Sequence, residues 1–224
     1  VMKDMISPME NTVYFLPNSD ARQSQIYFYI PMGDYNREEN VRREAFNQYI
    51  SGGFSGLIMN EIREKNSMAY TAYGFASSRG LPGAQTYFSG YIGTQNDKAV
   101  DAIDLYMKLL TDMPERPGRI DNIKSYLRQS ALTDHPDSRN LSLRIAEWKR
   151  RGYTDDPAKE ELPLIDSLTF PDIVDYYQKN IKGKPIIIGV LGNPKDISID
   201  ALKKFGKVIR LNEKKLFNEK DTMF

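Results

Sequence analysis

The stretch "GGFSGLIMNEIREKNSMAYTAYGFAS", residues 52–77, changes from one hydrophobic periodicity to another. After the glycines, apolar residues recur at helical spacing and predict a helix over 54–65. From 69 to 78 aromatic and small residues alternate and predict a strand. The predicted buried stripe of the helix consists of Phe54, Leu57, Ile58 and Ile62. The stretch therefore predicts a glycine turn, a helix and a strand in close succession.

The remaining segments repeat this mixture of strands and helices. Thr169 with Asp172 three residues later resembles a capping box and predicts the start of a helix at 170. On the predicted helix 96–113, Val100, Ile103, Met107 and Leu110 form an apolar seam. We expect strands at 13–17, 25–33, 69–78, 84–94, 184–192 and 207–211, and helices at 36–50, 54–65, 96–113, 118–133, 138–151, 170–181 and 197–206.

Strands grouped as hairpins, with helices grouped between them, favour an α+β fold. We expect a two-layer sandwich in which helices pack on one face of a largely antiparallel sheet. No internal repeat or low-complexity linker divides the chain, so one domain over residues 1–224 is the simplest prediction. The sequence begins with Val1 and no signal-like region, which is typical of a piece of a longer chain.

The composition excludes several classes of function. The 31 basic and 30 acidic residues nearly cancel, so no broad positive field favours nucleic acid or an anionic membrane. The chain has no cysteine, which excludes disulfides, thiolate catalysis and cysteine-ligated metals. No apolar run approaches the roughly 20 residues of a membrane-spanning helix, so we expect no membrane span.

Two features that suggest chemistry have simpler explanations. The "SGGFSG" segment, 51–56, lacks the lysine of a phosphate-binding loop and follows a predicted helix, so a structural turn is the favoured interpretation. His135, the only histidine, lies in a polar Asp/Pro turn. A single histidine without partner residues cannot build the usual three-ligand zinc site. A solvated loop histidine is the favoured interpretation there.

Arg63 and Tyr70 carry the strongest functional signal. On spacing alone, a dipole-stabilised arginine and a packing tyrosine remain the simpler interpretation. However, a guanidinium and a phenol are both hydrogen-bond donors at neutral pH, and such groups hold peptide carbonyls or developing oxyanions.

The stretch 52–77 resembles the non-catalytic half of the pitrilysin-family zinc peptidases, the inverse zincins that include insulysin and mitochondrial processing peptidase. Those proteins carry a glycine/serine turn, a helix that ends in an arginine, and a tyrosine seven residues after that arginine. Arg63 and Tyr70 have this spacing here. The segments 91–110, 164–181 and 184–193 are similar to later parts of the family, so the resemblance covers about residues 12–211.

The resemblance implies a processing-peptidase-like fold and a substrate-binding domain without a zinc site. Family enzymes bind zinc through an H-x-x-E-H motif, which this chain lacks, so zinc is expected on a partner domain and no metal or cofactor here. Arg63 and Tyr70 would bind peptide substrate and the tetrahedral intermediate. Tyr73 and Phe75 would line the peptide chamber or belong to the core.

The partner would be an H-x-x-E-H-bearing catalytic domain, on the same polypeptide or on a separate subunit. Two alternatives stay open, namely a non-catalytic scaffold of the same fold and an unrelated α+β binding module. The resemblance favours a bacterial periplasmic or cell-envelope setting.

Overall fold

The computed structural model describes residues 7–134 and 138–213, apart from the side chain of Phe54. The strands are β1 Thr12–Pro17, β2 Gln23–Asp34, β3 Thr71–Ser77, β4 Gln85–Gln95, β5 Ile187–Gly192 and β6 Lys207–Arg210. The α-helices are α1 Asn40–Ser51, α2 Ala99–Thr111, α3 Ile120–Thr133, α4 Leu141–Arg150, α5 Pro157–Ser167, α6 Phe170–Asn180 and α7 Ile199–Leu202. Short helical turns are η1 Arg37–Glu39, η2 Gly53–Ser55, η3 Met59–Glu64, η4 Asn96–Lys98, η5 Pro117–Arg119 and η6 Lys203–Phe205.

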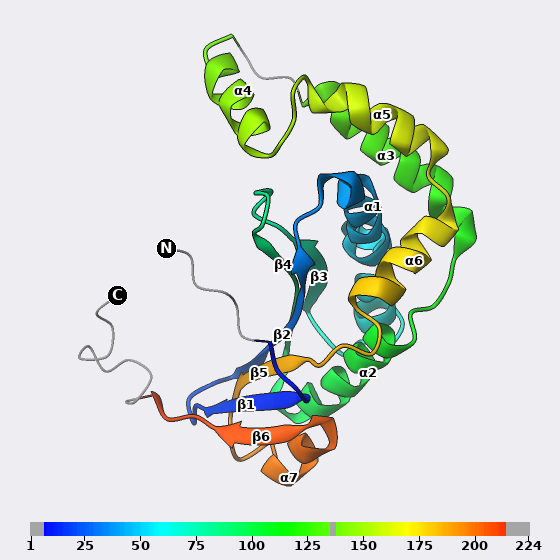
Figure 1. The fold of residues 1–224 in the computed structure, drawn as a ribbon. Coiled ribbons are helices and arrows are strands. Elements are labelled where there is room, and N and C mark those ends of the chain that lie inside the picture. The colour runs from blue at the N-terminus through cyan, green and yellow to red at the C-terminus, as the bar shows by residue number, and fades with distance from the viewer. Residues whose placement is uncertain (1–6, 135–137, 214–224) are drawn as a thin grey trace, which may run out of the picture.

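The strands form one sheet in the order β3-β4-β2-β5-β1-β6. The pairs β3–β4, β4–β2 and β2–β5 are antiparallel, and β1 pairs in parallel with β5 and β6. In Figure 1 the helices α1, α2, α3, α5 and α6 form an arc on one side of the sheet. The predicted α+β class, with a largely antiparallel sheet and helices on one face, is confirmed.

Strand β2 follows the predicted alternation. Ile26, Phe28 and Ile30 are buried under the helices, whereas Tyr27 and Tyr29 lie on the opposite face. The two faces of the sheet therefore differ, and one of them carries aromatic side chains that no helix of the described ranges covers.

Tyr106 of α2 sets the distance between helix and sheet. Its ring stacks on Phe28 at 4.1 Å between centroids, and its hydroxyl donates to the carbonyl of Tyr73 at 2.9 Å. It lies directly over Gly74 and Gly90, where an added Cβ would meet the hydroxyl at 2.4 and 2.1 Å. Only glycine at these paired positions lets the helix approach so closely.

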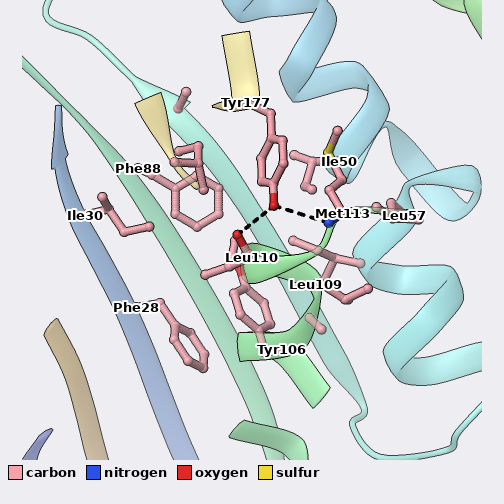
Figure 2. Close-up of a cluster of buried hydrophobic side chains, with 14 of the residues drawn as sticks. Phe28, Ile30, Ile50, Leu57, Phe88, Tyr106, Leu109, Leu110, Met113 and Tyr177 are labelled. Atoms are coloured by element: carbon pink, nitrogen blue, oxygen red, sulfur yellow. Dashed lines mark hydrogen bonds between the residues drawn. The ribbon is translucent and has the colours of Figure 1, made fainter. Parts of the chain in front are cut away.

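Tyr177 joins α6 to the end of α2 inside the core. Its hydroxyl donates to the carbonyl of Leu110 at 3.1 Å and accepts from the N–H of Met113 at 3.2 Å, as Figure 2 shows. Both backbone groups belong to the region where the helix ends and carbonyls lose their helical partners. The tyrosine thus satisfies polar groups that would otherwise be buried without partners.

The buried side of α2 differs from the predicted seam. Ile103 and Leu110 are buried as predicted, but Val100 and Met107 are only half-buried. The observed buried residues are Ala99, Ala102, Ile103, Tyr106, Leu109 and Leu110. The helix is rotated from the predicted orientation because Tyr106 occupies the space above the two glycines.

The predicted continuous helix over 54–65 is wrong in detail. Residues 53–55 form a 3-10 turn, Gly56 is extended, and Met59–Glu64 form a π-helix. Leu57, Ile58 and Ile62 are buried as predicted. The side chain of Phe54, which was assigned to the same stripe, lies outside what the structure describes.

Helix α5 was not predicted, and its prolines explain why. Pro163 lies inside the helix, and Pro157 occupies its first turn after the cap Asp156, whose carboxylate accepts from the N–H of Ala158 at 2.9 Å. Proline in a helical segment normally signals a break. The predicted capping box at Thr169 is confirmed, since the Asp172 carboxylate accepts from the Thr169 N–H at 2.8 Å.

No helix within the described ranges has the length and apolar character needed to cross a membrane.

Candidate functional site

Arg63 lies in the last turn of the π-helix η3. The N–H of Lys65 donates to the carbonyl of Asn60 at 3.0 Å, which is the five-residue spacing of a π-turn. The extra residue in the turn rotates the following side chains relative to their positions in an α-helix. The Arg63 side chain is 40% exposed, in agreement with its predicted place off the buried stripe.

Tyr70 lies directly before β3 and is fixed through its backbone. Its N–H donates to the carbonyl of Gly93 on β4 at 3.0 Å, whereas its side chain is 80% exposed. A fixed backbone with an exposed side chain is suited to presenting the phenol to a ligand.

The outer edge of β3 is capped by α1. Ser51 Oγ accepts from the N–H of Gly74 at 2.8 Å, and Asn47 accepts from the N–H of Ala76 at 2.7 Å and donates to the carbonyl of Ala76 at 3.0 Å. These side chains replace a neighbouring strand and occupy that part of the edge. They hold β3, and with it Tyr70, in a fixed place on the sheet.

The structure brings Arg63 and Tyr70 together. The guanidinium carbon of Arg63 lies 5.8 Å from the centroid of the Tyr70 ring, within the range of a cation–π contact. Both residues line a surface hollow of about 450 Å³. The charged neighbour of Arg63 is Glu64, with 3.6 Å between Nε and Oε1, and such exposed pairs hold a side chain only weakly. The guanidinium can therefore turn toward a ligand in the hollow.

Residues distant in sequence complete the hollow. Gln23 comes from the start of β2, Thr94 and Gln95 from the end of β4, and Lys98 from η4. Sequence analysis did not identify them, because the pairing of β2, β3 and β4 brings them to Tyr70 and no local spacing reports that pairing.

Tyr73 and Phe75 lie on the open face of the sheet and not in the core. They are 40% and 39% exposed, and their rings stack at 6.0 Å. Tyr73 also contacts Tyr91 at 5.3 Å, and Tyr91 contacts Tyr27 at 5.1 Å, so an aromatic row crosses β3, β4 and β2. Of the two predicted alternatives, the core is excluded for these residues.

The glycine segment is a structural turn. Gly53 has φ +59°, and a Cβ on Gly56 would lie 2.7 Å from the backbone of Ser51. The guanidinium of Arg119 donates to the carbonyls of Tyr49, at 3.3 Å, and Ser55. The turn thus presents carbonyl oxygens to a cation, the opposite of the N–H groups that cradle a phosphate.

The described ranges contain no group of three or more histidine, cysteine, aspartate or glutamate side chains that could hold a metal ion. His135, predicted to be a solvated loop residue, lies outside the described residues.

Taken together, the fold and the hollow define a class, an α+β domain with an arginine–tyrosine pair beside its sheet. Residues 7–118 match the family model of the peptidase M16 inactive domain. The chain therefore belongs to this family, and the resemblance to the non-zinc-binding domain of pitrilysin-type peptidases is confirmed.

Solved structures have the same fold. The peptidase M16 inactive domain from Pseudomonas fluorescens matches with a TM-score of 0.69 and 15% identity, covering 86% of this chain and 46% of that chain. The periplasmic protease PqqL from Escherichia coli matches with a TM-score of 0.64 and 15% identity, covering 83% and 21%. A chain of complex III2 from Candida albicans matches with a TM-score of 0.63 and 12% identity, covering 90% and 50%.

The chain thus spans half or less of the length of these proteins. No curated protein sequence matches it.

Proposed function

We propose that this chain is the substrate-binding partner domain of a zinc-dependent endopeptidase that encloses peptides in a chamber. The observation that carries the proposal is that Arg63 and Tyr70 line one hollow, with 5.8 Å between the guanidinium carbon and the centroid of the tyrosine ring. On this proposal, Arg63 and Tyr70 bind the peptide substrate, and both donate to the oxygen of the tetrahedral intermediate. Neither group has to change its protonation state to act as a donor.

Zinc and the water-activating glutamate reside on the partner, an H-x-x-E-H-bearing catalytic domain on the same polypeptide or on a separate subunit. When bound there, zinc would supply polarisation of the scissile carbonyl and activation of water. The match to an inactive-domain model and to only 21% of the length of the periplasmic protease PqqL supports this division of labour. On this proposal residues 1–224 form one such domain of a longer or multi-subunit protein.

The test is peptide cleavage by this chain together with its catalytic domain. Arg63→Ala and Tyr70→Phe should each lower kcat/KM by about 100-fold, the effect of removing one oxyanion donor in other enzymes. Arg128→Ala and Tyr126→Phe are matched controls, because these side chains are 50% and 53% exposed on α3, outside the hollow. Unchanged kinetics in the first pair of variants would overturn the site assignment.

The second candidate function is a non-catalytic scaffold of the same fold. The match to a chain of complex III2 supports this second candidate, because that chain belongs to a complex. Reading the parent polypeptide and its genomic neighbours for H-x-x-E-H distinguishes the two functions. If no such motif occurs and the purified parent complex cleaves no peptide, the scaffold is correct.

A further inference from the structure

The turn between Arg63 and Tyr70 is a strained helix end. The N–H of Ser67 donates to the carbonyl of Arg63 and the N–H of Met68 donates to the carbonyl of Ile62, each at 2.9 Å. Each of these bonds spans one residue more than the corresponding bond of the Schellman pattern that ends an α-helix, so the two bonds close a π-type turn. Ser67 occupies its left-handed position with φ +50°, and within the described ranges it is the sole non-glycine residue with positive φ. Glycine is the usual residue here, since a side chain makes this conformation unfavourable.

Two side chains from the other wall of the hollow hold this turn. Lys98 Nζ donates to the carbonyl of Ser67 at 3.3 Å, and Thr94 Oγ1 donates to the carbonyl of Met68. Together with the bond from the Tyr70 N–H to the Gly93 carbonyl, they tie residues 67–70 to residues 93–98. A strained conformation persists where its surroundings over-determine it in this way.

The wall that supplies these donors is itself fixed by Asn96. This side chain is 8% exposed; its Oδ1 accepts from Ser24 Oγ at 2.7 Å and from the N–H of Asn193 at 3.2 Å, and its Nδ2 donates to the carbonyl of Ala21 at 2.8 Å. The end of β4 is thus joined to Ala21 in the β1–β2 connection, to Ser24 in β2 and to the loop after β5. It provides a rigid support for the turn.

We propose that Thr94 and Lys98 are positioning residues for the Arg63/Tyr70 pair, an inference that rests on the proposed function. By holding two successive carbonyls of the turn, they set the direction in which the helix end presents Arg63 relative to Tyr70. Donors that stabilise a transition state must be placed to within a fraction of an ångström, and a displacement of about 1 Å can cost about 100-fold in rate. Releasing the turn should therefore lower kcat and leave KM nearly unchanged.

The first test uses Thr94→Val, which keeps the shape and removes the hydroxyl, in the protein complete with its catalytic domain. We expect kcat to fall about tenfold or more, with KM changed less than twofold. Thr94→Ser keeps the hydroxyl and should restore kcat. Thr86→Val is the matched control, because Thr86 lies on the same strand, is also buried and donates to the carbonyl of Gly33 at 2.6 Å, far from the hollow. An equal loss in both variants would indicate a general effect of destabilising β4 and overturn the inference.

The second test asks whether Thr94 and Lys98 act through the pair. Thr94→Val and Lys98→Met are combined with Arg63→Ala, or with Tyr70→Phe where residual activity is too low to measure. If they act by positioning, each should have little further effect in these backgrounds. Additive losses would overturn the inference. If Arg63→Ala and Tyr70→Phe are themselves without effect, the proposed function fails first; if they lower kcat/KM but Thr94→Val does not, the positioning role alone fails.

Discussion

The Arg63 guanidinium carbon lies 5.8 Å from the centroid of the Tyr70 ring, although six residues and a change from helix to strand separate the two in sequence. The contact exists because the π-helix η3 ends in a tight turn and because the N–H of Tyr70, directly before β3, is hydrogen-bonded to Gly93 of β4. An arginine and a phenol held in this way form a pair of donors on one side of a hollow.

Replacing Arg63 by lysine tests whether the planar guanidinium matters. We expect Arg63→Lys in the complete peptidase to lose most of the kcat/KM lost in Arg63→Ala, because an ammonium lacks the fork of donors and stacks less well on tyrosine. Steady-state cleavage of a peptide by the lysine and alanine variants measures this. Activity of Arg63→Lys close to that of the unaltered protein would show that only the charge is needed.

Gly90→Ala should destabilise the fold. Its Cβ would lie 2.1 Å from the hydroxyl of Tyr106, so α2 or the sheet must shift. Overpacking of this kind costs about 1–3 kcal/mol in free energy of unfolding, measurable by urea denaturation. Gly118→Ala is the control, since a Cβ there meets no atom within 4 Å. Equal stability of the two variants would contradict the role given to Tyr106.

Tyr177→Phe should cost about 1–3 kcal/mol, because it leaves the buried Met113 N–H and Leu110 carbonyl without the hydroxyl. The matched change Tyr126→Phe removes a hydroxyl from a side chain that is 53% exposed, so its effect should be within about 0.5 kcal/mol. Thermal or urea unfolding of both variants provides the measurement. A neutral Tyr177→Phe would mean that these backbone groups find other partners.

Asp104 should stabilise the protein in a pH-dependent manner. Hydrogen bonds from Lys108, at 2.8 Å, and Lys204, at 2.6 Å, lower the pKa of its carboxyl below the usual value of 3.8. A lowered folded-state pKa contributes stability above the unfolded-state pKa, and this contribution disappears as the pH falls through the folded-state value.

Asp104→Asn should therefore be less stable than the unaltered protein at neutral pH, by about 0.2–1 kcal/mol for such partly exposed pairs. In urea titrations, the difference should shrink as the pH falls below 3.8 and vanish once the pH lies below the lowered folded-state pKa. A difference that persists unchanged at low pH would show that packing, and not charge, accounts for it.

Much of the secondary structure followed from local patterns. The alternation in β2 and the buried residues Leu57, Ile58 and Ile62 were predicted correctly, because burial on one face leaves a periodic trace in the sequence. The errors occurred where tertiary contacts override that trace. Tyr106 rotated α2 over two glycines, and α5 formed despite Pro163.

The sequence by itself determined the α+β class and the family, and it predicted Arg63 and Tyr70 as the candidate site, since these inferences depend on residue order alone. Only the tertiary structure decided that Arg63 and Tyr70 meet, that Thr94 and Lys98 reach the turn between them, and that Tyr73 and Phe75 lie on the open face. The physical reason is the pairing of β3 with β4, which brings residues 67–70 next to residues 93–98. Backbone and side-chain hydrogen bonds then join the two segments, and no local periodicity encodes their partners.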